Sequence, residues 1–490
     1  MSWAAAAAAL AGDRGSPVWQ RLRVSTMAAA ATGFLAACAF VIGAGAVGPV
    51  AGTVLRTRWL GLLAPGEPRP WWAGAVLLAG VSGLVAIWIV VVAMVQAGLL
   101  GVRQVATLAA VWSAPLVIGP PVLSNDVFSY AAQGVLQMSE FDPYHTSPAA
   151  LGQSDVLQAV DPRWRFARSP YGPVTTWLEH AAAWVTRGDL VQTVVVLRAL
   201  AVVSAILIGV LAVRIASPER RAMALTLTAA NPLLSLHGVS AVHLEVFIGV
   251  LLLGALWAAR HQRWVVAVAV ACVAGAVKVP AVLGAAIVAV DAGRRTQRWI
   301  RVSLGSALGV VAVWGGLTML VPDAWGWISG LATPGQGHTP IAPTEFTAYA
   351  LWFVSHGLLP LHEAETLTRL VGGLLAACIV LWLVLTTGRR PVPATLGLGL
   401  VAVAALGPVF YPWYLLWGVL CLAVVADART VRWLVPLSAA ACLVNLPGQA
   451  APSIVVAFAD AALVAVALRL RWSLRRPAVE VLVPAGTAGP

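Results

Sequence analysis

Residues 102–123 read VRQVATLAAVWSAPLVIGPPVL, and the chain then turns polar at Ser124-Asn125-Asp126. The first segment holds a single charged residue, Arg103. It is about as long as the roughly 20 apolar residues that a helix needs to cross a bilayer. The boundary at Leu123 therefore predicts a membrane helix that ends where a polar loop begins.

The whole chain has the composition of a membrane protein. Of its 490 residues, 60% are hydrophobic and 10% are charged, whereas about a quarter of a soluble domain is charged. The mean hydropathy is +0.87. These values exclude a soluble globule and predict an all-α, polytopic membrane protein. The five cysteines lie inside apolar runs, where thiols behave as small buried hydrophobes, so no disulfide or zinc site is predicted.

The basic residues indicate how the chain lies in the membrane. The net charge of +12 comes from short clusters between apolar runs, which is how membrane proteins fix their orientation, and nucleic-acid binding is not predicted. Arg14, Arg21 and Arg23 precede the first span and place the N-terminus in the cytoplasm. Lys278 is the only lysine, which makes it a residue of interest.

The clearest apolar runs are about 27–50, 72–95, 102–124, 190–213, 299–321, 366–387 and 450–470. Two further segments are assigned by keeping arginines in the cytoplasm. Residues 173–187 are expected to lie along the outer surface, and the run 264–291 is expected to break into two short helices at Lys278-Val279-Pro280. The result is about 14 transmembrane helices, with outer surface helices near 173–187 and 346–360.

This topology predicts one membrane domain between two tails. Residues 1–26 form a cytoplasmic N-terminal tail, and residues 471–490 form a cytoplasmic C-terminal tail. The domain covers 27–470, with outer loops at 124–189 and 322–365, in the plasma membrane.

Uncommon polar and aromatic residues gather on the outer face in this topology. They are Asp126, Asp142, His145, Asp155, Asp161, Arg163, Arg165, Arg168, Tyr171, His237, His243, Glu245, Lys278, His338, Glu345 and Tyr411-Pro412-Trp413-Tyr414. Ionisable groups at a membrane edge are costly and usually mark a site. Charges of both signs around one outer cavity suggest a substrate that is carried on a lipid and is itself charged.

Each of these residues also has a structural interpretation. Ser124, Asn125 or Asp126 can cap a short helix, and Asp142-Pro143-Tyr144 can form a turn. Lys278 can extend to the lipid headgroups, and Trp413-Tyr414 can belong to the interfacial aromatic belt. These alternatives stay open for single residues, but they do not explain why so many fall at one membrane face.

Several motifs carry a resemblance to a known family. They are Ser124-Asn125-Asp126-Val127-Phe128-Ser129-Tyr130-Ala131-Ala132-Gln133-Gly134, Asp142-Pro143-Tyr144, Ser169-Pro170-Tyr171-Gly172-Pro173, Asn231-Pro232-Leu233, Lys278-Val279-Pro280 and Tyr411-Pro412-Trp413-Tyr414. In order and spacing the chain resembles the GT-C type polytopic glycosyltransferases, in particular the actinobacterial polyprenol-phosphomannose-dependent α-1,6-mannosyltransferases of lipomannan and lipoarabinomannan assembly. One departure is His243-Leu244-Glu245, where a His-Asn-Asp sequence is expected.

The resemblance implies a GT-C-like fold that transfers mannose from a polyprenyl-phosphate-mannose donor to a lipid-anchored mannan acceptor. It gives Asp126 the role of general base, which takes a proton from the attacking hydroxyl. The leaving lipid phosphate needs cations, and the candidates are Lys278 and Arg168, with His243 as a further donor. The candidates for binding the sugar or the acceptor are Asn125, Tyr130, Asp142, Tyr144, Tyr171, His237, Glu245, Trp413 and Tyr414.

A single base without a second carboxylate nucleophile favours one displacement with inversion. No cofactor is expected; a divalent metal is possible, but the spacing of the acids indicates none. The expected partners are the lipid-linked donor, the lipid-anchored glycan acceptor and membrane lipids. The alternatives are a flippase or transporter of a lipid-linked sugar, a GT-C transferase of another sugar such as arabinose, and a structural partner in a cell-envelope complex.

Overall fold

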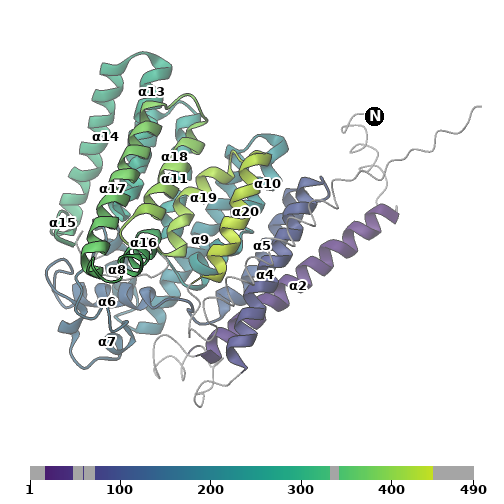
Figure 1. Cartoon of the computed structure of the whole chain (residues 1–490), viewed down its shortest axis with the longest axis horizontal. Helices are drawn as coiled ribbons and strands as arrows, with labels where there is room; N and C mark the ends of the chain where they lie inside the picture. The colour runs from purple at the N-terminus through teal and green to yellow at the C-terminus, as the bar shows by residue number, and fades with distance from the viewer. Residues whose placement is uncertain (1–16, 48–58, 60–71, 331–341, 445–490) are drawn as a thin grey trace, which may run out of the picture.

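The computed structural model describes residues 17–47, 59, 72–330 and 342–444, and this part of the chain contains helices and loops but no strand. In chain order the elements are α2 (Pro17–Val47), α4 (Ala73–Gln96), α5 (Val102–Ile118), α6 (Asp126–Met138), η1 (Pro148–Leu151), α7 (Asp155–Ala159), α8 (Pro173–Val185), α9 (Leu190–Ile215), η2 (Pro218–Arg220), α10 (Arg221–Leu227), η3 (Leu234–Ser240), α11 (Glu245–Arg260), α12 (Trp264–Val277), η4 (Val279–Val282), α13 (Leu283–Thr296), α14 (Trp299–Leu320), α15 (Trp327–Gly330), α16 (Pro343–Val354), α17 (Leu361–Leu385), α18 (Val392–Leu406), η6 (Pro412–Leu415), α19 (Leu416–Ala423) and α20 (Ala428–Leu443). The predicted all-α membrane architecture is confirmed (Figure 1).

Five described helices, α2, α4, α9, α14 and α17, are long and apolar enough to cross a membrane. A sixth span results if η3 and α11, which meet at an angle of 113°, are counted as one broken span. Four apolar helices are shorter, at 102–118, 264–277, 392–406 and 412–423. The count of about 14 crossings stays a prediction, and the expected span 450–470 lies outside the described residues.

Two local predictions can be compared directly with the helices. The break at Lys278 is confirmed, because α12 ends at Val277 and α13 begins at Leu283 after the short turn η4. Pro280 cannot donate a hydrogen bond inside a helix, which accounts for the break. Helices α8 and α16 have 13 and 12 residues and are too short to cross a bilayer, in keeping with the two surface helices predicted there.

Arginines hold the helix ends together at one end of the bundle. The guanidinium of Arg260, at the end of α11, donates to the carbonyl of Ile215 at the end of α9. Arg294, near the end of α13, donates to the carbonyl of Leu385, the last residue of α17, at 2.6 Å and to that of Thr387 just beyond it at 2.8 Å. Cations at helix C-termini satisfy the last carbonyls and the helix dipole. Helices α6, α7, α8 and α15 lie at the opposite end (Figure 1).

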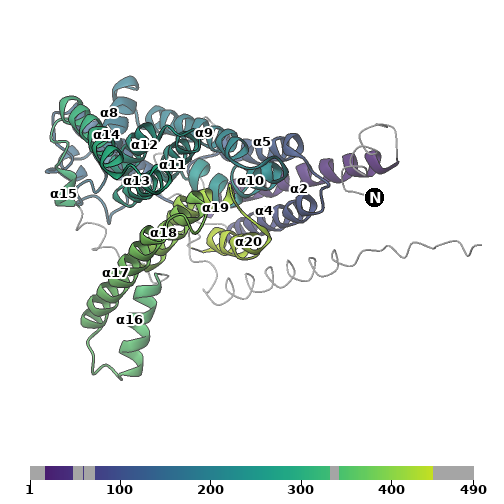
Figure 2. The same cartoon turned by 90° about the horizontal axis from the view of Figure 1, so that it is seen from above.

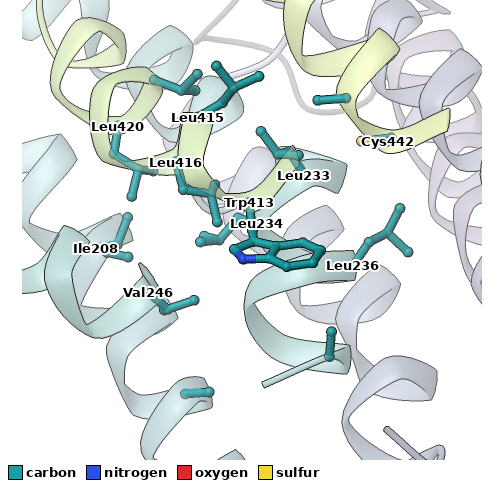
Figure 3. Close-up of a cluster of buried hydrophobic side chains, with 14 of the residues drawn as sticks. Ile208, Leu233, Leu234, Leu236, Val246, Trp413, Leu415, Leu416, Leu420 and Cys442 are labelled. Carbon is teal, nitrogen blue, oxygen red and sulfur yellow. The ribbon is translucent and has the colours of Figure 1, made fainter. Parts of the chain in front are cut away.

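The C-terminal helices enter the bundle unequally. Helices α16 and α17 project beside α18 as an arm, while α19 and α20 pack among the earlier helices (Figure 2). Figure 3 shows Trp413, from η6, among Leu233, Leu234 and Leu236 of the η3 region. Trp413 is 4% exposed, so this apolar contact fixes η6 against η3 and positions the residues on either side of both.

Candidate active site

Asp126 is the first residue of α6 and follows a strained turn. Leu123 has φ = 78°, a backbone conformation that side-chain-bearing residues rarely adopt and that often occurs at functional sites. The side chain of Asn125 does not cap the helix; its amide lies 3.4 Å from Oδ2 of Asp161 and donates to it. The capping interpretation of Asn125 is therefore wrong. The Asp126 side chain is 20% exposed.

His243 faces Asp126 from another part of the chain. Its Nδ1 lies 3.5 Å from Oδ2 of Asp126, and its side chain is 0% exposed. The preceding residue, Val242, has φ = 61°, a genuine outlier for a β-branched residue. Strained backbone thus precedes both members of the Asp126–His243 pair, which indicates that the surrounding fold holds them in place.

A column of aromatic rings supports His243. Its ring stacks on Trp413 with centroids 3.8 Å apart and planes 16° apart. Trp413 in turn stacks on Tyr411 at 4.6 Å, and His237 lies 5.6 Å from Trp413. The imidazole is therefore fixed on one side by an indole that is itself part of the core.

Arg198 joins the two segments that carry the pair. This buried arginine of α9 donates to the carbonyls of Val117 and Gly119 at the end of α5 and to that of Ser240 at the end of η3. The first two residues lie just before the Asp126 turn and the third lies just before His243. One side chain thus fixes the approach of both segments.

Lys278 lies in a charged and aromatic cage. Its Nζ is 2.8 Å from Oε1 of Glu245, whose side chain is 2% exposed. The ammonium lies over the rings of Tyr414, Trp417 and Tyr171 at 4.0, 5.3 and 5.6 Å. Such contacts attract a cation to the faces of aromatic rings. The Lys278 side chain remains 17% exposed. Two residues of its cage, Tyr171 and Tyr414, also line an adjacent pocket.

That pocket encloses about 640 Å³ of empty space, part of it open to solvent. Its lining residues are Asp126, Ser129, Gln133, Trp164, Ala167, Arg168, Pro170, Tyr171, Val409, Tyr411 and Tyr414. Arg168 is exposed and makes no hydrogen bond or ion pair with the rest of the described chain. A carboxylate, an uncommitted cation and several aromatic faces therefore share one cavity.

The electrostatic surroundings of Asp126 suit a base. Burial and the neighbouring Glu245 carboxylate raise the pKa of Asp126 to about 6, because both disfavour the charged form. A general base is most effective when its pKa lies near the working pH.

Some residues named from the sequence lie elsewhere. Asp142 accepts a hydrogen bond from the backbone N–H of Tyr144 at 2.8 Å, which is the turn interpretation. Tyr144 is buried, with its hydroxyl 3.3 Å from that of Thr176, and neither Asp142 nor Tyr144 lines the pocket. Asp142, His145 and Asp323 bring three ligand atoms within 4.8 Å of one another, and they are the one such group found among the described residues.

Other predicted residues surround the pocket without lining it. Tyr130 is buried and meets the pocket residue Tyr171 edge to face, with centroids 5.5 Å apart. The residues that sequence reasoning did not single out include Ser129, Gln133 and Trp164. For the first two a signal existed, because positions 126, 129 and 133 share one face of a helix.

The loop before α8 contacts the break at Lys278 very closely. The N–H of Gly172 donates to the carbonyl of Val277 at 3.1 Å, and a Cβ at position 172 would collide with the carbonyl oxygen of Ala276. We expect Gly172→Ala to destabilise the protein by about 1–3 kcal/mol, since overpacking forces the backbone apart. A lower melting temperature in detergent would show this. Gly373→Ala is the matched control, because a Cβ there meets open space, and an equal loss in both variants would contradict the prediction.

Comparisons with known proteins agree with the motifs. A family model described as "Alpha-(1->6)-mannopyranosyltransferase, N-terminal domain" matches residues 30–294, and "MptB C-terminal domain" matches residues 343–472. A probable alpha-(1->6)-mannopyranosyltransferase of Mycolicibacterium smegmatis is 31% identical over 64% of this chain and 63% of its own length. Alpha-(1->6)-mannopyranosyltransferase B of Corynebacterium glutamicum is 27% identical over 71% of this chain and 64% of its own length. The chain thus spans less than two thirds of these relatives. No solved structure matches it.

Proposed function

We propose that this chain, which belongs to the alpha-(1->6)-mannopyranosyltransferase family, moves mannose from polyprenyl-phosphate-mannose to a lipid-anchored mannan acceptor, with an α-1,6 linkage, on the outer face of the membrane. The observation that supports this best is a pocket in which the Asp126 carboxylate and the uncommitted Arg168 guanidinium face aromatic walls. This arrangement suits a reaction between a hydroxyl group and a sugar on a lipid phosphate.

In the proposed reaction Asp126 accepts the proton of the acceptor hydroxyl as its oxygen attacks the anomeric carbon. The bond from that carbon to the phosphate oxygen breaks, and the phosphate leaves with the electron pair. Arg168 and Lys278 stabilise the charge that develops there. An ammonium has three donors, so Lys278 can keep its hydrogen bond to Glu245 and still donate another to a phosphate. One displacement inverts the anomeric centre, and a β-linked donor gives an α-linked product.

His243 takes a different position from the other two predicted phosphate contacts. Its side chain has no exposed surface and its Nδ1 faces Asp126, so the proposal assigns the phosphate to Arg168 and Lys278. The outer-face orientation is supported by Arg260 and Arg294, which bind helix ends at the opposite end of the bundle from α6 (Figure 1).

The proposal is tested with the full chain in lipid nanodiscs. The donors are radiolabelled polyprenyl-phosphate-mannose and, separately, polyprenyl-phosphate-arabinose; the acceptor is an octyl α-1,6-dimannoside. Growth of the acceptor by one α-1,6-linked mannose is the expected product. Transfer of arabinose but not of mannose would support the alternative function, a transferase of another sugar. Movement of the donor across the bilayer of proteoliposomes, without sugar transfer, would support the flippase. A transporter is, however, expected to have polar groups through the depth of the helix bundle.

The proposed base gives the reaction a defined pH dependence. Asp126 must be ionised to accept a proton, so activity is present above its pKa of about 6 and is lost as the pH falls through that value. We expect kcat/KM to fall about tenfold for each pH unit well below 6. Profiles measured between pH 4.5 and 8 at constant ionic strength, on protein that regains full activity after return to pH 7, would check this. A flat profile down to pH 4.5 would remove Asp126 from the role.

A further inference from the structure

Two polar side chains of α6 line the pocket, and each has a buried oxygen without a hydrogen-bond partner in the described part of the chain. Ser129 and Gln133 lie on the same wall as Asp126. Gln133 is 5% exposed, and both Oγ of Ser129 and Oε1 of Gln133 are buried without a hydrogen-bond partner among the described residues. Buried polar groups in native proteins almost always have partners, so these two atoms indicate a ligand that supplies them.

The three side chains form a row along the helix. Positions 126, 129 and 133 lie on one face because they are spaced by three and four residues. At a rise of about 1.5 Å per residue, Ser129 lies about 4.5 Å and Gln133 about 10 Å from Asp126 along the helix axis. The row begins at the proposed base and has a length comparable with that of two linked pyranose rings.

The aromatic lining of the pocket has the complementary chemistry. Trp164, Tyr171, Tyr411 and Tyr414 are among the other lining residues and provide flat apolar faces with polar edges. A pyranose has apolar C–H faces and a rim of hydroxyl groups, so aromatic rings suit its faces and Ser129 and Gln133 suit its rim. A serine hydroxyl and a glutamine amide can each donate and accept, as sugar hydroxyls do. An isolated phosphate would instead favour the guanidinium of Arg168, which also lines the pocket.

We infer that Ser129 and Gln133 form a hydroxyl-binding row, which holds the ring hydroxyls of a pyranose whose reacting end lies at Asp126. The inference rests on the proposed function and adds to it the residues that recognise the sugar. The transferred sugar and the acceptor sugar offer the same hydroxyl chemistry, and the experiment distinguishes them.

The test uses Ser129→Ala and Gln133→Met in the full chain in nanodiscs, with polyprenyl-phosphate-mannose and the octyl α-1,6-dimannoside. Each variant is expected to lose about tenfold in kcat/KM, the effect of one hydrogen bond to substrate. The melting temperature should not fall, because each change removes a buried oxygen that has no hydrogen-bond partner among the described residues. Ser139→Ala and Gln192→Met are matched controls, since both residues are exposed and lie outside the pocket; they should keep wild-type kinetics.

Monodeoxy substrates then locate the hydroxyl groups. The wild type should lose about tenfold with the deoxy substrate that lacks the bound hydroxyl, and the matching variant should lose nothing further. If the deoxy substrate with which a variant loses nothing further is a deoxy donor, the row holds the transferred sugar. If it is a deoxy dimannoside, the row holds the acceptor sugar. Unchanged kinetics in both variants, or losses that stay fully additive with every deoxy substrate, would overturn the inference. A wild-type protein that transfers no sugar would instead refute the proposed function.

Discussion

Replacing Asp126 with Asn is expected to abolish sugar transfer while the protein still accumulates in the membrane. The amide has the shape of the carboxylate but cannot accept the proton of the attacking hydroxyl, and a general base contributes about 10²–10⁴ in rate. The side chain lies at the pocket wall, 3.5 Å from Nδ1 of His243, so the substitution leaves the packing intact. Single-turnover transfer in nanodiscs, with the protein amount determined by fluorescence of a C-terminal tag, gives the measurement.

The matched control for this variant is Asp155→Asn. Asp155 is an exposed acid in the first turn of α7, at the same end of the molecule, and it does not line the pocket. It should retain wild-type rates. Near-normal transfer by the Asp126→Asn variant would eliminate this carboxylate as the base, whereas equal losses in both variants would point to a general effect of acid removal at this surface.

The sequence predicted the membrane fold and one membrane face for the site, because both depend on quantities that can be counted along the chain. Apolar run length gives helices, and arginine clusters give sidedness. The same reasoning located the helix break at Lys278, since the alternative placed arginines on the wrong side. Sidedness gives only the depth of a residue in the membrane, however, and not its neighbours. It places Asp142 and Asp126 at the same depth without saying that only Asp126 lines the pocket.

The contacts inside the site depend on lateral packing, which the sequence pattern does not encode. Glu245 stands where the resemblance suggested a different local sequence, and the structure pairs its carboxylate with Lys278 at 2.8 Å. The stack of His243 on Trp413 joins residues 170 positions apart and requires η3 and η6 to be packed by their leucines. Ser129 and Gln133 were readable as members of the helix face of Asp126, but only the pocket shows that this face lacks partners.

Lys278→Met is expected to cost the protein about 3–5 kcal/mol of stability, because it leaves the Glu245 carboxylate buried without its partner. It should also slow transfer by about 10²–10³, the usual effect of removing one group that stabilises a developing negative charge. These two losses have different causes, and a second substitution separates them. In Lys278→Met with Glu245→Gln, no uncompensated charge remains, so the melting temperature should recover while transfer stays at least about 100-fold down.

Thermal unfolding in detergent and single-turnover transfer in nanodiscs measure the two effects on the same preparations. Arg295→Met is the matched control, since Arg295 pairs with Asp291 at the cytoplasmic end predicted for α13 and its side chain is 60% exposed. The Asp291 carboxylate is only 12% exposed, so this change also removes the partner of a buried acid and should lower stability, but it should leave transfer unchanged. Recovery of both stability and transfer in the double variant would make the Lys278–Glu245 pair purely structural. Recovery of stability alone would show that the Lys278 ammonium of the wild type acts on the substrate, since the double variant lacks only its charge and not the surrounding aromatic residues.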